Sequence, residues 1–130
     1  MALAVGMRGE ASLMVDDAQT AEAFGAGGVR VFGTPAMIGL MENAAWRLVQ
    51  PELEEGETTV GTLVEIRHLA ATPVGMRVVA TAELVEIDGR RLVFRVAARD
   101  ERGPIGEGRH ERMRVRLDRF LARLGEAREG

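Results

Sequence analysis

One carboxylate in this sequence lies within an otherwise apolar stretch, which makes Glu42 the first candidate for chemistry. The stretch covers residues 37–49 and has the composition of a helix that is buried on most of its sides. An ionised carboxylate is rarely buried without a partner. Glu42 is therefore expected either to pair with an arginine or to act as a general base or nucleophile.

His68 is one of only two histidines, and its side chain can donate or accept a proton near neutral pH. It lies in a stretch, residues 59–69, whose side chains alternate with a period of two. The alternation places His68 with Val60 and Ile66 on the face expected to lie against the helix, and Gly61 on the opposite face. His68 is thus a candidate acid or base, although a histidine at a strand end often has only a structural role.

A helix is predicted to start at Thr34 and Pro35. The Thr34 hydroxyl is expected to cap the first amides, and Pro35 suits the first helical position. The helix should end at Gln50, because Pro51 disfavours a helical conformation in the preceding residue. Eight residues of regular helix rise about 12 Å. Thr34 and Glu42 of one chain therefore cannot readily hold the same atom, unless the helix start bends or the site combines two subunits.

The rest of the chain predicts a sheet around this helix. Strands are expected over residues 10–15, 59–69, 77–87, 90–99 and 105–117, and a short amphipathic helix over residues 118–126. Asp88 and Gly89 indicate a two-residue hairpin. One long helix followed by antiparallel strands predicts the α+β class, with the sheet wrapped around the central helix in a single domain, residues 1–130. A long sheet edge needs cover, so we expect a homodimer.

Composition narrows the function classes. The net charge of −3 gives no indication of nucleic-acid binding. The absence of cysteine excludes disulfides, thiolate metal sites and a cysteine nucleophile, and we expect neither a metal nor another cofactor. No apolar stretch is long enough for a membrane span, and the N-terminal residues do not have the order of a signal peptide. We therefore expect a cytoplasmic protein without a membrane partner.

Three sequence blocks carry a family resemblance. They are residues 34–42 (TPAMIGLME), residues 60–75 (VGT, then HLAATPVG) and residues 105–112 (IGEGRHER). With these blocks in this order, the chain resembles the fluoroacetyl-CoA thioesterase-like family of hot-dog fold thioesterases. The resemblance implies a hot-dog fold, a dimer, and hydrolysis of a short-chain acyl-CoA thioester to the free acid and coenzyme A, and it leaves open whether two dimers pair into a tetramer.

The resemblance also assigns roles to residues. It implies that Thr34, Glu42 and His68 are the catalytic residues. It makes Gly61 the glycine whose backbone binds the thioester carbonyl. Arg112 is then a substrate-binding residue, and with the arginines that follow it on the same strand it is a candidate anchor for coenzyme phosphates.

The stretch ahead of Thr34 departs from the family pattern. Fluoroacetyl-selective members have bulky aromatic residues there, whereas this chain has glycines at 25, 27 and 28, with only Phe24 and Phe32 nearby. We therefore expect an ordinary short acyl group and an open pocket mouth, with the pocket lined by residues 37–41. Two alternatives are a hot-dog hydratase or dehydratase and a non-catalytic acyl-CoA binding module.

Overall fold

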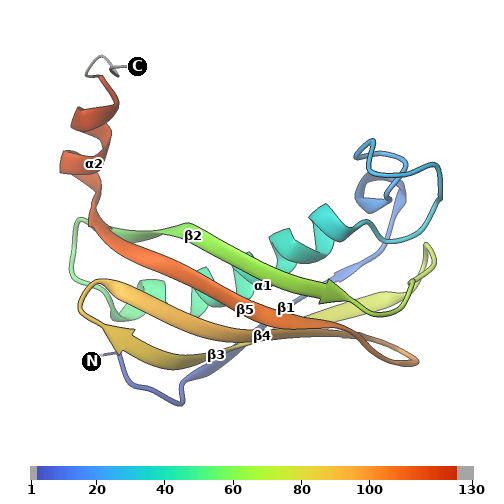
Figure 1. Cartoon of the computed structure of the whole chain (residues 1–130), viewed down its shortest axis with the longest axis horizontal. Helices are drawn as coiled ribbons and strands as arrows, with labels where there is room; N and C mark the ends of the chain where they lie inside the picture. Colours follow the sequence, from blue (N-terminus) through green and yellow to red (C-terminus); the bar gives the residue numbers. More distant parts are fainter. Residues whose placement is uncertain (1–2, 126–130) are drawn as a thin grey trace.

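The computed structural model describes residues 3–125 as five strands and two α-helices (Figure 1). The elements are β1 (Arg8–Met14), the 3₁₀ helix η1 (Asp17–Gln19), α1 (Thr34–Val49), the 3₁₀ helix η2 (Gln50–Glu52), β2 (Glu57–His68), β3 (Arg77–Asp88), β4 (Arg91–Asp100), β5 (Gly103–Arg116) and α2 (Leu117–Leu124). The predicted α+β class is confirmed.

All five strands form one antiparallel sheet in the order β1-β3-β4-β5-β2. The sheet curves around α1, which lies along its inner face (Figure 1). The predicted hairpin joins β3 to β4, but Asp88 pairs with Arg91, so the two turn residues are Gly89 and Arg90. Gly89 has φ +60°, a conformation that glycine adopts at no steric cost. The β2 strand forms one edge of the sheet.

Helix α1 buries one broad face against the sheet. Its buried residues are Ala36, Met37, Leu40, Met41, Ala44, Ala45 and Val49. The opposite side leaves Gly39, Asn43 and Trp46 exposed, so the expectation of burial on most sides is wrong for the single chain. The apolar composition overstated burial because small and aromatic residues also occupy the outer stripe.

The start of α1 differs from the prediction in one respect. Gly33 is the N-cap residue, Thr34 is the first residue of the helix, and no side chain caps the first amides. The predicted N-cap role of Thr34 is therefore wrong. The Thr34 hydroxyl instead contacts a ring nitrogen of His68, which leaves it in a position to do chemistry.

Strand β2 contains a bulge, which changes the residues of the strand that point to the inner face of the sheet. Gly61 pairs with Arg112 and Leu63 pairs with Glu111, so Thr62 is an extra residue. A bulge of this kind breaks the period of two. Before it, Gly61 faces α1; after it, His68 faces α1. The predicted placement of Gly61 on the face opposite His68 is therefore wrong, and both residues line the inner side of the sheet.

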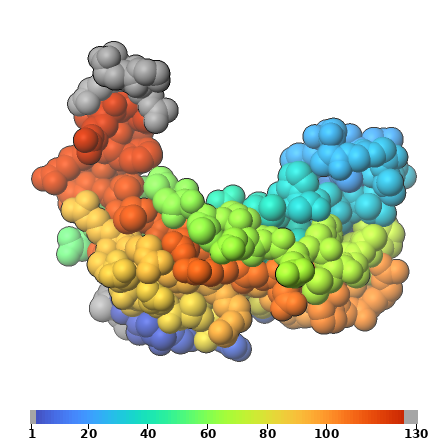
Figure 2. Space-filling model, viewed as in Figure 1, coloured from blue at the N-terminus to red at the C-terminus, as the bar shows by residue number. Residues whose placement is uncertain are grey.

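Helix α2 begins directly after β5 and extends away from the sheet (Figure 1). None of its described residues is buried, and Leu117, Leu121 and Leu124 are exposed. Figure 2 shows α2 on one side of a concave face, the segment before α1 on the other side, and β2 between them. Within residues 3–125, no helix is both long and apolar enough to cross a membrane.

Candidate active site

The first group of site residues is the pair Thr34 and His68. Thr34 lies at the start of α1 and His68 at the end of β2, and the hydroxyl Oγ1 is 2.7 Å from the imidazole Nδ1. Residues 34 apart in the sequence are thus joined by a short hydrogen bond. A hydroxyl in contact with an imidazole can exchange a proton with it, as in acid–base and nucleophilic catalysis.

The second ring nitrogen of His68 lies inside the protein. Its Nε2 is buried and has no hydrogen-bond partner among the described residues. Burial lowers the pKa of His68 below its usual value of 6.5, because a charged imidazolium loses hydration when it is buried. The imidazole is therefore neutral at physiological pH, which is the state that can accept a proton.

A cavity of about 360 Å³ adjoins this pair. Its lining residues are Ala21, Ala26, Val31, Phe32, Thr34, His68, Leu69, Ala70 and Ala71. None of residues 37–41 lines this cavity, and Met37 and Met41 are fully buried in the core between helix and sheet; the acyl-pocket lining expected from the sequence stays a prediction. The glycine-containing segment ahead of α1 provides the wall instead.

The second group is built around Glu42. Its carboxylate Oε2 lies 3.5 Å from Nη1 of Arg112 on β5. The Glu42 side chain is 42% exposed, so it is less buried than the sequence predicted. A Cβ atom at Gly61 would lie only 2.7 Å from Glu42 Oε2. Glycine is thus required here for the carboxylate to rest directly against the β2 backbone.

Arg112 is held inside the protein. Its Nε donates to the Thr59 hydroxyl at 2.8 Å and its Nη2 to the Thr59 carbonyl oxygen at 3.0 Å. Only 7% of the residue is exposed. These contacts favour a role in holding Glu42 over contact with a coenzyme phosphate. The next arginines on the same strand face are already paired as well, Arg114 with Glu57 and Arg116 with Asp118.

Sequence reasoning missed His110 as part of this group. It is only 1% exposed and faces inward beside Arg112. Its Nε2 is 3.2 Å from Nη1 of Arg112. The signal that could have found it is its place on the same strand face as Arg112, two residues earlier in the IGEGRHER block.

The two groups lie apart within one chain. Helix α1 is continuous from Thr34 to Val49, so the rise between Thr34 and Glu42 is about 12 Å. The helix start does not bend to bring them together. Among residues 3–125, no cluster of three His, Asp or Glu side chains has the arrangement of a metal site. What the chain presents is a hydroxyl–imidazole pair beside a cavity, and a carboxylate fixed against a glycine.

Comparison with known proteins identifies the family. Residues 15–118 match the family model described as FlK, fluoroacetyl-CoA-specific thioesterase. The chain belongs to this FlK family. A fluoroacetyl-CoA thioesterase of Streptantibioticus cattleyicolor is 48% identical over 94 residues, which cover 72% of this chain and 68% of that protein. The family resemblance and the thioesterase class expected from the sequence are confirmed.

Solved structures support the same conclusion. A structure of the fluoroacetyl-CoA thioesterase FlK is 38% identical with a TM-score of 0.92, covering 99% of this chain and 100% of its own. A thioesterase superfamily member of Thermus thermophilus is 34% identical with a TM-score of 0.86, over 93% and 90% of the two chains. A hot-dog-like protein from Thermanaerovibrio acidaminovorans has a TM-score of 0.87 at 26% identity, over 95% and 94%. The hot-dog fold is thus confirmed.

Proposed function

We propose that this FlK family member hydrolyses a short-chain acyl-CoA thioester to the free acid and coenzyme A. The observation that carries the proposal is the 2.7 Å contact between Thr34 and His68 beside a cavity of about 360 Å³. The family matches supply the thioester chemistry, since the matched relatives are thioesterases. The substrate's coenzyme portion is part of the reaction, and no further cofactor enters it.

In the proposed reaction, each residue has one task. Glu42 either removes a proton from the water that attacks the carbonyl carbon, or attacks that carbon itself as a nucleophile. His68, neutral before the reaction, takes up one proton of the water and passes it to the departing thiolate, and the Thr34 hydroxyl is its hydrogen-bond partner. The Gly61 amide polarises the carbonyl oxygen as charge develops on it. The carbon–sulfur bond breaks, and the water oxygen becomes part of the acid.

We propose that the active unit is a homodimer in which these groups meet across the interface. The separation of about 12 Å along α1 supports a site shared between two subunits. The β2 edge strand is 12 residues long, and long edges are normally paired or covered. The exposed leucines of α2 provide apolar surface beside that edge. Thr34 and His68 of one subunit would then face Glu42 and Gly61 of the other. Pairing of dimers into a tetramer and a cytoplasmic location stay predictions.

The acyl group is the finer part of the proposal. The relatives are named for fluoroacetyl-CoA, and the lack of fluoroacetyl selectivity expected from the sequence stays a prediction. It rests on the glycines at 25, 27 and 28, together with an exposed Phe24 and a buried Phe32. An assay of thiol release across a panel of acyl-CoA substrates tests both the hydrolysis of acyl-CoA and the selectivity for the acyl group. Release from acetyl-CoA and propionyl-CoA at rates similar to fluoroacetyl-CoA is expected.

Two outcomes of this panel would contradict the proposal. A strong preference for fluoroacetyl-CoA in competition with acetyl-CoA would overturn the expected selectivity while leaving the thioesterase reaction intact. Binding of acyl-CoA without thiol release from any substrate would contradict hydrolysis itself. The assay needs only the purified protein and a thiol reagent.

A further inference from the structure

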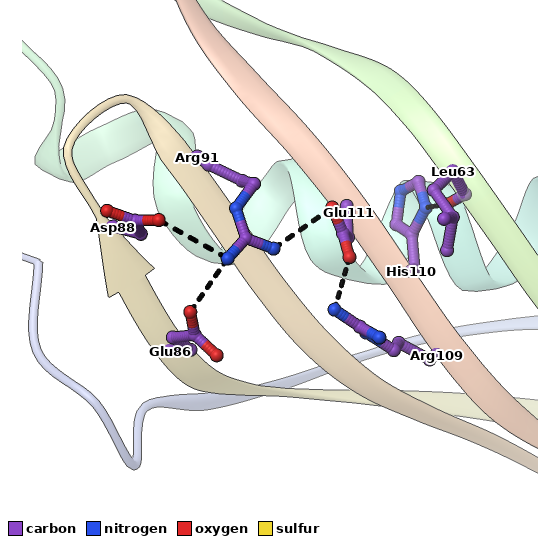
Figure 3. A network of polar contacts seen from close by, with 7 residues as sticks. All are labelled: Leu63, Glu86, Asp88, Arg91, Arg109, His110 and Glu111. Atoms are coloured by element: carbon purple, nitrogen blue, oxygen red, sulfur yellow. Dashed lines mark hydrogen bonds and ion pairs between the residues drawn. The ribbon is translucent and has the colours of Figure 1, made fainter.

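His110 is a buried polar residue that the proposed reaction does not use. Its side chain is directed from β5 toward Leu63 of β2, on the opposite side of the strand from Glu111 (Figure 3). It also stacks on Phe94, with ring centroids 6.0 Å apart and an angle of 29° between the rings. A polar ring buried at this depth needs partners for both nitrogens.

The partners of His110 define its tautomer. Nδ1 lies 2.8 Å from the carbonyl oxygen of Leu63, and a carbonyl only accepts, so Nδ1 carries the hydrogen. Nε2 lies 3.2 Å from Nη1 of Arg112, and a guanidinium only donates, so Nε2 presents its lone pair. The contacts therefore require a neutral imidazole with the hydrogen on Nδ1.

Arg112 is oriented from two sides. Thr59 accepts one hydrogen from Nε and one from Nη2, which leaves the second hydrogen of Nη2 and the two hydrogens of Nη1. One of the Nη1 hydrogens reaches Nε2 of His110 and the other is directed to Oε2 of Glu42 at 3.5 Å. A protonated His110 would present a hydrogen to Nη1 and push the guanidinium away. The position of Glu42 is thus linked, through Arg112 and His110, to the carbonyl group of Leu63, the residue after the bulge.

We propose that His110 is a positioning residue, whose neutral imidazole holds Nη1 of Arg112 in the direction that fixes the Glu42 carboxylate against Gly61. This rests on the proposed function, in which Glu42 acts on the thioester. The charged groups near His110 are Arg112 and Glu42 on its own side of β5, and Glu111 on the opposite side. Burial is the main cause that lowers the pKa of His110, which keeps the ring neutral.

Two substitutions separate the tasks of the ring. In His110→Asn the amide nitrogen can still donate to Leu63, but no acceptor remains for Arg112. In His110→Gln an oxygen can reach the Nε2 position and accept from Arg112. We expect His110→Asn to lower kcat about tenfold to a hundredfold with little change in KM, because small displacements of catalytic groups have effects of that size. His110→Gln should recover most of the loss.

A double-mutant cycle distinguishes positioning from general stability. If His110 acts through Glu42, His110→Asn should change kcat less than about twofold when Glu42→Gln is already present. The control is Val78→Ala, a core truncation on β3, which should lower the melting temperature and leave kcat unchanged. Normal kcat in His110→Asn would overturn the proposal. Equal losses in His110→Asn and His110→Gln that persist in the Glu42→Gln background would also overturn it.

A spectroscopic measurement tests the proposal without any activity. The chain has only two histidines, so the His68→Gln variant gives a nitrogen-15 spectrum of the His110 ring alone. The expected result is the neutral tautomer with hydrogen on Nδ1 at pH 7. An imidazolium, or hydrogen on Nε2, would overturn the proposal. If the wild-type protein releases no thiol from any acyl-CoA, the proposed function fails, while this spectrum still decides the role of His110.

Discussion

Replacing Gly61 with alanine should separate activity from stability. The added methyl group would lie 2.7 Å from Oε2 of Glu42, 3.4 Å from Cε1 of His110 and 3.5 Å from Nη1 of Arg112. Only the first contact is impossible, and the atom concerned is at the end of a flexible side chain. The Glu42 carboxylate must therefore move by about 0.7 Å to reach the 3.4 Å of an ordinary contact. Its interaction with Arg112 is already long, at 3.5 Å, so we expect this displacement to weaken it.

The expected consequence is a loss of turnover in a folded protein. A misplacement on the order of 1 Å can cost about a hundredfold in rate, so Gly61→Ala should lower kcat roughly tenfold to a hundredfold. Gly61 does not have a positive φ, so alanine fits its backbone. Alanine also restricts the unfolded chain, which stabilises a protein by about 0.4–1 kcal/mol. The melting temperature should therefore be unchanged or slightly higher.

The assay is thiol release from the best substrate of the panel, measured together with thermal melting. The control is Gly125→Ala, where the added Cβ meets only an ordinary contact of 3.5 Å and kcat should not change. Wild-type kcat in Gly61→Ala would refute the idea that the exact place of the Glu42 carboxylate matters. A large drop in melting temperature would refute the geometric argument itself.

Two further predictions concern the titratable residues of the site. Glu42→Gln and His68→Ala should each lower kcat at least about a hundredfold without lowering the melting temperature. The double variant should have a kcat little lower than that of the slower single variant, because the two residues act as a unit. Near-normal thioester hydrolysis by Glu42→Gln would make Glu42 a structural ion-pair residue. Burial lowers the pKa of both His68 and His110 below 6.5. Just below that pH the unfolded chain therefore binds more protons than the folded chain. The melting temperature should thus decrease as the pH is lowered from about 7.5 to about 5.5. A flat melting temperature over this range would contradict the burial of two neutral histidines.

The sequence was sufficient for the main elements of the fold. The apolar run after Thr34 and the period of two from residue 59 onward both correspond to observed elements, α1 and the strands β2 to β5. These elements can be predicted without a structure, because they are defined by the hydrophobic periodicity of residues close together in the sequence. The hot-dog fold itself followed from the three sequence blocks, not from periodicity alone.

The features that could not be predicted from the sequence depend on contacts between residues that are distant in the chain. The bulge at Thr62 arises from how β2 pairs with β5, and it moves Gly61 to the inner face. His110 and Arg112 alternate with other polar residues in the sequence, which is typical of a solvent-facing strand, but the close approach of Glu42 to Gly61 brings a compensating charge to them. Buried polar networks of this kind are recognised from three-dimensional pairing, since each member alone has the pattern of a surface residue.

The central claim is that Thr34 and His68 of one subunit work with Glu42 of the other, and mixing two inactive variants tests it most directly. The His68→Ala and Glu42→Gln variants are unfolded, mixed in equal amounts and refolded together. About half of the dimers then contain one chain of each variant. A site shared across the interface gives such a dimer one intact site of its two, and the mixture should recover about a quarter of the wild-type rate. Each variant refolded alone should stay inactive. A mixture that contains mixed dimers and recovers no activity would contradict the shared site.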